Sequence, residues 1–91
     1  METRNELRRR IKGMMVNNLM LQVTADEIGD HQPLFGPNSL GLDSVDALQL
    51  VVTLEKEFGL KIADQGIARQ VMQSVDHMAS AIQNGLPVKA P

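Results

Sequence analysis

Ser44 and its immediate neighbours are the residues of this chain whose types and spacing could do chemistry. Ser44 follows Gly41, Leu42 and Asp43, and it precedes a mainly apolar run from Val45 to Leu54. Gly41 can turn the backbone freely, and the short oxygen side chain of Asp43 or Ser44 can cap the start of a helix. At that position a phosphate attached to the serine hydroxyl would lie at the positive end of the helix dipole, which favours it by about 0.3–1 kcal/mol. The pattern therefore suits a serine that forms a phosphoester.

Two other interpretations of Ser44 start from the same residues. A hydrolase-type nucleophile elbow needs glycine two positions before and two positions after the serine, but Leu42 and Asp46 occupy these positions. We therefore expect no catalytic residue and no enzymatic activity. In the second interpretation Asp43 and Ser44 only cap a helix of an interaction module that carries no prosthetic group, and composition alone favours this one.

The residues around Ser44 also resemble a known family. The resemblance to acyl carrier proteins is carried by two runs, Leu40-Gly41-Leu42-Asp43-Ser44-Val45-Asp46-Ala47-Leu48 and Leu54-Glu55-Lys56-Glu57-Phe58. It implies that 4′-phosphopantetheine is attached covalently to Ser44 by a phosphopantetheinyl transferase, and that Asp43 assists the transfer by helping to coordinate magnesium. The implied function is to hold acyl intermediates as thioesters for fatty-acid, polyketide-type or specialised lipid biosynthesis, with a peptidyl carrier as the alternative.

Helix start and stop signals predict four helices. Thr3 and Glu6 form a capping-box pattern before a helix over residues 4–21, and the helix that begins at Ser44 should end at Phe58, before Gly59. Asp64 can cap a short third helix that runs to residue 71, and Ser74 can cap a fourth helix that ends near residue 84. Residues 24–40 contain repeated glycine and proline and read as a long loop. The fold class is therefore all-α, a small four-helix bundle over residues 1–85, with residues 86–91 as a flexible tail.

Apolar residues at helical spacing define the expected core. In the first helix they include the pairs Met14-Met15 and Met20-Leu21, which we assign to the core. Ile28, Leu34 and Phe35 should pin the long loop against the bundle. The remaining expected core positions in the first and fourth helices are Leu7, Ile11, Leu19, Val75, Met78, Ala79 and Ile82.

The second helix carries more apolar surface than one packed face requires. One stripe is wide enough for the core and consists of Ala47, Leu50, Val51, Leu54 and Phe58. A second stripe of Val45, Leu48 and Val52 lies on another side, near the acidic Asp46 and Glu55. We expect the second stripe to be exposed and to form a docking surface for partner enzymes, because contiguous apolar patches on small proteins usually bind something. The alternative is that the bundle buries both stripes.

Charge is distributed unevenly along the chain, whose net charge is −2. The first 22 residues carry five basic and two acidic side chains, a net charge of +3, and the remainder carries −5. The partners of the chain should therefore be basic rather than anionic. The family resemblance implies that they are acyl-loading, condensing and modifying enzymes, with basic docking surfaces. Asp46, Glu55 and Glu57 resemble the acyl rather than the peptidyl branch of the family. Gln49 and Lys56 occupy positions that are commonly acidic in housekeeping fatty-acid carriers, which favours a specialised pathway.

Several classes of function are disfavoured by what the sequence lacks. The run of three arginines at residues 8–10 should be a solvated helix face and not a nucleic-acid site, because no aromatic residue is interleaved for base stacking. His31 and His77 should face solvent and bind no metal, and the absence of cysteine excludes a disulfide. No apolar stretch approaches the roughly 20 residues of a membrane span, so we expect a cytoplasmic monomer. The third helix, with Gly66 and Arg69, departs from the acidic pattern of the family.

Overall fold

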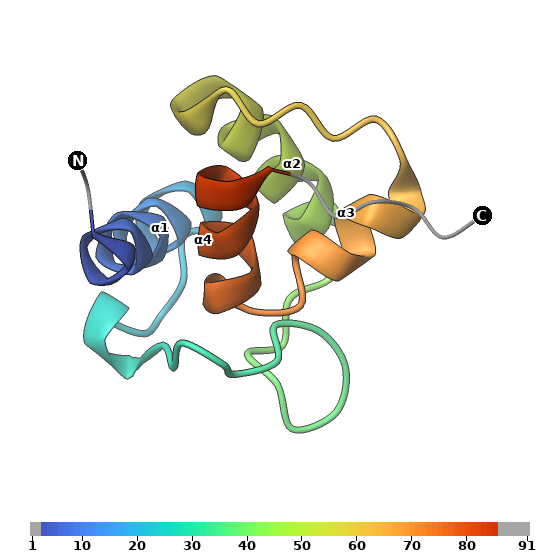
Figure 1. Ribbon diagram of the computed structural model, residues 1–91. Helices are drawn as coiled ribbons and strands as arrows, with labels where there is room; N and C mark the ends of the chain where they lie inside the picture. The colour runs from blue at the N-terminus through green and yellow to red at the C-terminus, as the bar shows by residue number, and fades with distance from the viewer. Residues whose placement is uncertain (1–2, 86–91) are drawn as a thin grey trace.

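Four helices form the bundle in the computed structural model, which describes residues 3–85. In chain order they are α1 (Arg4–Leu19), the 3-10 turn η1 (Ala25–Glu27), α2 (Ser44–Phe58), α3 (Gln65–Val71) and α4 (Val75–Asn84). Helix α4 lies between α1 and α3 and packs against both, while α2 packs against α1 (Figure 1). The predicted all-α fold with a long first loop and a short third helix is confirmed. The predicted tail, residues 86–91, lies outside the described residues.

The helix ends follow the predicted capping signals. Thr3 and Glu6 form the capping box of α1, with the Glu6 amide donating to Thr3 Oγ1 over 3.1 Å. Asp64 accepts from the Ile67 amide at the start of α3, and Ser74 accepts from the His77 amide at the start of α4. The predicted ends of the last three helices agree with the structure because local side-chain chemistry decides each of them.

The first helix ends two residues earlier than predicted, before Met20. The helix stops at Leu19, not at residue 21, and Met20 adopts a left-handed backbone with φ of 51°. Leaving the helical path turns its side chain away from the core, so Met20 is 85% exposed although we assigned it to the interior. Leu21, the other member of the pair, is half-buried and packs against the core.

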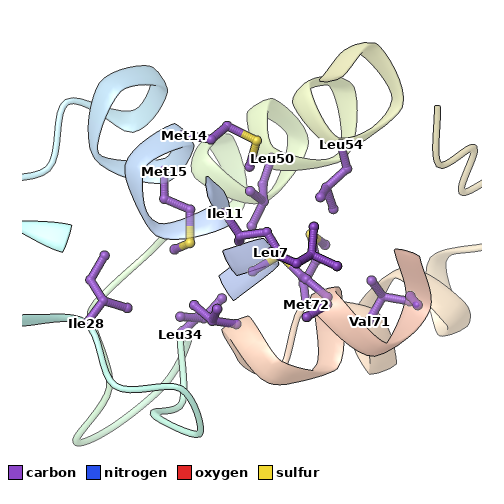
Figure 2. Packing of buried hydrophobic residues seen from close by; sticks show 14 of the residues in the cluster. Leu7, Ile11, Met14, Met15, Ile28, Leu34, Leu50, Leu54, Val71 and Met72 are labelled. Atoms are coloured by element: carbon purple, nitrogen blue, oxygen red, sulfur yellow. The ribbon is translucent and has the colours of Figure 1, made fainter. Parts of the chain in front are cut away.

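The core lies where α1, α2 and α4 meet, and the long loop closes one side of it (Figure 2). Ile28 and Leu34 of the loop are buried, as predicted, while Phe35 is half-buried. Met15 and Met78 are fully buried, and unbranched methionine side chains adapt well to irregular spaces of this kind. Leu7, Ile11, Leu50 and Leu54 are also buried in the core. The loop is therefore an ordered part of the bundle.

Helix α2 presents two different apolar faces. Leu50 and Leu54 are buried, with exposed fractions of 1% and 0%. On the other side, Val45, Leu48 and Val52 keep exposed fractions of 71%, 67% and 52%. The first stripe thus packs against the core, with its other members, Ala47, Val51 and Phe58, half-buried, and the second stripe lies at the surface.

An ion-pair cluster joins α1 to the long loop and to α4. Arg8 pairs with Asp76, and Arg4 reaches the same carboxylate over 3.3 Å. Lys12 pairs with Asp30 of the loop over 2.6 Å, and the Asp76 amide donates to the Asp30 carbonyl over 2.8 Å. Because these contacts link segments far apart in the sequence, they fix the loop against the bundle.

The arginine run is therefore not the simple solvated face that we predicted. Arg8 is partly buried in the ion-pair cluster, and the Arg10 guanidinium lies 4.8 Å from the ring centre of Phe58, a cation–π geometry. Arg9 is exposed. The run contributes to packing between helices because two of its three members contact other elements.

Truncating the two faces of α2 should have different effects on stability. Leu54→Ala opens a cavity in a fully packed site and should reduce the free energy of unfolding by about 2–5 kcal/mol. Val52→Ala removes a half-exposed side chain, so its effect should be much smaller. Urea denaturation of both variants measures the difference, and equal losses would contradict the assignment of the two faces.

The ion-pair cluster should make the free energy of unfolding depend on pH in the acidic range. Hydrogen bonding from Arg8 holds the pKa of Asp76 below its ordinary value of 3.8, and hydrogen bonding from Lys12 does the same for Asp30. A lowered folded pKa stabilises the fold above pH about 4, and this stabilisation is lost as the pH falls through the folded value. Asp76→Asn should therefore lose less stability than the wild type on acidification below pH about 4. Chemical denaturation across that range, with the exposed Glu57→Gln as control, would contradict the account if the wild type and Asp76→Asn declined in parallel.

Candidate functional site

Asp43 and Asp46 cap the start of α2 through two reciprocal hydrogen bonds. The Asp46 amide donates to Asp43 Oδ1 over 2.9 Å, and the Asp43 amide donates to Asp46 Oδ2 over 3.1 Å. The sequence left open whether Asp43 or Ser44 is the cap, and the structure assigns it to Asp43. Both capping hydrogen bonds are therefore made without the Ser44 hydroxyl.

Ser44 is the first residue of α2, and its side chain is exposed. Within residues 3–85 its hydroxyl makes no hydrogen bond, so no contact would have to break before it reacted. It stands at the positive end of a 15-residue helix, where backbone amides and the helix dipole favour an attached anion. These features fit a phosphoester on Ser44.

The segment before Ser44 is held by backbone contacts and one buried side chain. Gly41 has φ of 85°, which an L side chain adopts only with strain. Leu42 is buried, and its amide donates to the Leu34 carbonyl over 3.0 Å. Leu34 in turn donates to the Gln73 carbonyl over 3.3 Å, which connects this segment to the turn between α3 and α4. The position of Ser44 is thus fixed by two separate parts of the chain.

A hollow of about 640 Å³ lies beside Ser44. Its volume falls within the range of roughly 300–1,000 Å³ that is typical of small-molecule pockets. The walls come from the long loop, the start of α2, the end of α3 and the start of α4. The residues that line it are His31, Pro33, Leu34, Phe35, Leu42, Asp43, Ser44, Ala47, Arg69, Met72, Gln73, Ser74 and His77.

The sequence did not predict which polar residues would lie near Ser44. Both histidines are exposed, as predicted, but His31 and His77 also line the hollow together with Arg69. His31 is about 40 residues from the other two, and it lines the same hollow because Leu34 of the loop bonds to Gln73, which lies between Arg69 and His77 in the sequence. No local pattern reports that contact, although the cap at Ser74 does place His77 in the first turn of α4.

The remaining predicted site residues share α2 with Ser44. Val45, Leu48 and Val52 form the exposed apolar stripe, which we call the α2 stripe. Glu55 is exposed, while Asp46 is half-buried and its carboxylate takes part in the cap. Asp46 therefore has a structural function in addition to any contact with a partner.

Residues 3–85 contain no cluster of three or more histidine, cysteine or acidic side chains that could hold a metal ion. Within the same range, every helix is too short or too polar to cross a membrane.

Comparison with known proteins identifies the family. The family model for the phosphopantetheine attachment site matches residues 9–82, which is most of the chain. The chain belongs to this family. The family's phosphopantetheine prosthetic group, predicted from the sequence, is thereby confirmed, and the exposed Ser44 hydroxyl at a helix start fits it.

Two proteins that are similar to this chain are acyl carrier proteins. Acyl carrier protein 2 of Pseudomonas aeruginosa is 38% identical over 47 residues, which cover 50% of this chain and 60% of that protein. The holo acyl carrier protein of Nitrosomonas europaea has a similar solution structure, with a TM-score of 0.66 and 18% identity over 84% of this chain and 90% of its own.

A further similar fold comes from a crystal structure of an engineered glycine:[carrier protein] ligase of Bradyrhizobium japonicum in complex with ATP and a carrier protein from Agrobacterium tumefaciens. The matching chain has a TM-score of 0.69 and 21% identity, over 85% of this chain and 96% of its own. At this identity the similarity establishes the shared carrier fold.

Replacing the two residues at the start of α2 should separate capping from attachment. Asp43→Ala removes the acceptor for the Asp46 amide and should reduce the free energy of unfolding by about 0.5–2 kcal/mol. Ser44→Ala removes a hydroxyl that caps nothing, so the change should stay within about 0.5 kcal/mol. Urea denaturation of the unmodified proteins measures both, and a larger loss for Ser44→Ala than for Asp43→Ala would show that the serine is the cap.

Proposed function

We propose that this chain is an acyl carrier protein whose 4′-phosphopantetheine arm is attached to Ser44. The observation that carries the proposal is the exposed Ser44 hydroxyl, which the Asp43–Asp46 cap leaves without a structural task. When bound, the prosthetic group supplies a terminal thiol on which acyl groups are held as thioesters. The chain itself holds and presents the cargo, and separate enzymes do the chemistry.

The residues around Ser44 divide this task among them. The helix start stabilises the negative charge of a phosphoester, and the buried Leu42 keeps the serine at a fixed position. Asp43, next to the hydroxyl, is proposed to help the phosphopantetheinyl transferase hold magnesium during attachment. The hollow next to Ser44 offers space in which part of the cargo can be shielded from water.

The α2 stripe is proposed as the docking surface for the phosphopantetheinyl transferase and for acyl-loading, condensing and modifying enzymes. Val45 and Leu48 lie within the first two turns of α2, close to the attachment site, and both are largely exposed. An exposed apolar surface bordered by acidic side chains suits a partner that is apolar at its centre and basic at its rim. Glu55 and Asp46 supply that acidic border.

An acyl cargo is favoured over a peptidyl cargo, and a specialised pathway over a housekeeping one. Support for the acyl cargo comes from the acidic Glu55 and Glu57 and from the 38% identity to an acyl carrier protein. Support for the specialised pathway comes from Gln49 and Lys56, both exposed on α2 where housekeeping fatty-acid carriers are commonly acidic.

Loading by a phosphopantetheinyl transferase tests the attachment site. The wild type should gain the mass of one phosphopantetheinyl group, and Ser44→Ala should gain none while keeping its helical circular dichroism. Asp43→Asn should load more slowly with little loss of stability, because asparagine caps helices as well as aspartate does but lacks the charge. Loading of Ser44→Ala would reject the site, and equal rates for Asp43→Asn and the wild type would remove Asp43 from the transfer step.

A second experiment tests partner choice. Changing Gln49→Glu and Lys56→Glu together should raise turnover by basic fatty-acid synthase enzymes, because charge complementarity mainly increases the rate of association. The gain should be largest at low ionic strength, where screening is weakest. The specialised-pathway proposal fails if these enzymes already turn over the wild type as fast as a housekeeping carrier, or if the double variant shows no gain in turnover at low salt. Neither result would affect the proposed attachment at Ser44.

A further inference from the structure

The hydrogen bond between Ser74 and His77 determines the tautomer of neutral His77, a residue that lines the hollow. Ser74 is 2% exposed, its Oγ accepts from the His77 amide over 3.2 Å, and it lies 2.7 Å from His77 Nδ1. Among the described residues, Nδ1 is the acceptor available for the buried hydroxyl proton, which would otherwise lack a partner. In neutral His77, Nδ1 therefore accepts and Nε2 carries the proton. His77 is exposed at the hollow, so its Nε2–H is a free donor.

Arg69 adds a second donor to the lining of the hollow. It is exposed on α3, and within residues 3–85 it forms no ion pair. Its guanidinium offers several N–H groups and accepts none. The Asp43 carboxylate lies in the same lining, but one of its oxygens already accepts from the helix start. The hollow thus combines apolar walls with several polar side chains. Among these, Arg69 and the His77 Nε2–H can only donate, while His31 and Gln73 also line the hollow.

From this arrangement we infer that the hollow selects acyl groups that carry an oxygen acceptor beyond the thioester, such as a 3-oxo group, over saturated chains of equal length. This inference rests on the proposed attachment at Ser44. A saturated chain lying in the hollow would cover Arg69 and His77 without pairing them, and a covered donor that lacks a partner is unfavourable. A carbonyl oxygen on the cargo would accept from these donors while the carbon chain contacts Leu34, Leu42 and Met72.

Two acyl forms of the same protein test the inference. The wild type is loaded on Ser44 from hexanoyl- and 3-oxohexanoyl-coenzyme A by a promiscuous phosphopantetheinyl transferase, and intact mass verifies the loading. The 3-oxohexanoyl form should have a thermal midpoint higher by about 4–8 °C, as expected for one added hydrogen bond in a domain of this size. The ¹⁵N resonance of His77 Nε2 should shift in the 3-oxohexanoyl form and stay near its holo value in the hexanoyl form.

Matched variants decide which residue is responsible. Arg69→Gln should reduce the difference between the two acyl forms, whereas Arg9→Gln, the same substitution at an exposed site on α1, should leave it unchanged. Circular dichroism checks that both variants fold. Equal midpoints for the two acyl forms of the wild type would overturn the inference.

The unacylated holo form separates the cargo from the arm. If the His77 Nε2 resonance already shifts between the unmodified protein and the holo form, the group that accepts from His77 belongs to the phosphopantetheine arm. This result would also overturn the inference. Failure of Ser44 to load would instead reject the proposed function, and the inference with it.

Discussion

The two hydrogen bonds between Asp43 and Asp46 are the contacts on which the rest of the site depends. They cap the first turn of α2, with the Asp46 amide donating to the Asp43 carboxylate over 2.9 Å and the Asp43 amide donating to the Asp46 carboxylate over 3.1 Å. A helix start needs such partners, and serine is one of the residues that commonly supply them. Because the aspartates take this role, Ser44 can lie in the first turn with its hydroxyl exposed. Structural support and chemical reactivity are thus assigned to different side chains.

The long loop brings the rest of the site to Ser44. Its buried Leu34 bonds on one side to Leu42 and on the other to Gln73, so that the start of α2 and the turn before α4 are held at one place. Lys12 and Asp30 fix the other end of the loop to α1. The hollow exists because these contacts hold the loop beside the helices. Contacts between the loop and the helices therefore determine the shape of a site whose reactive atom lies on a helix.

Features that local chemistry determines could be predicted from the sequence. Asp64, Ser74 and Gly59 mark helix ends by capping or by backbone freedom, and the helices end where these residues indicate. The spacing of apolar residues in α2 separated the buried Leu54 from the exposed Val52. Ser44 itself stood out because it combines a helix start with a family pattern.

Features that depend on long-range packing could not be predicted. Met20 continues the apolar spacing of α1, but the backbone turns left-handed there and exposes the side chain. Asp76 pairs with Arg4 and Arg8, about 70 residues earlier in the chain, and no spacing rule reports such a contact. Arg69 and His77 line the same hollow as Ser44, and Leu34 of the loop bonds both to Leu42, before Ser44, and to Gln73, between Arg69 and His77. A single sequence contains the residues of these contacts but no signal that pairs them.

Peptide mapping of the loaded protein tests the central claim most directly. Trypsin cleavage after Lys12 and Lys56 releases residues 13–56, which contain Ser39 and Ser44, while Ser74 and Ser80 fall in another peptide. Fragmentation of the modified peptide should place the phosphopantetheinyl group on Ser44 alone. A group on Ser39, Ser74 or Ser80, or protein that stays unmodified under conditions that load a known carrier, would contradict the claim that the Asp43–Asp46 cap leaves Ser44 free for attachment.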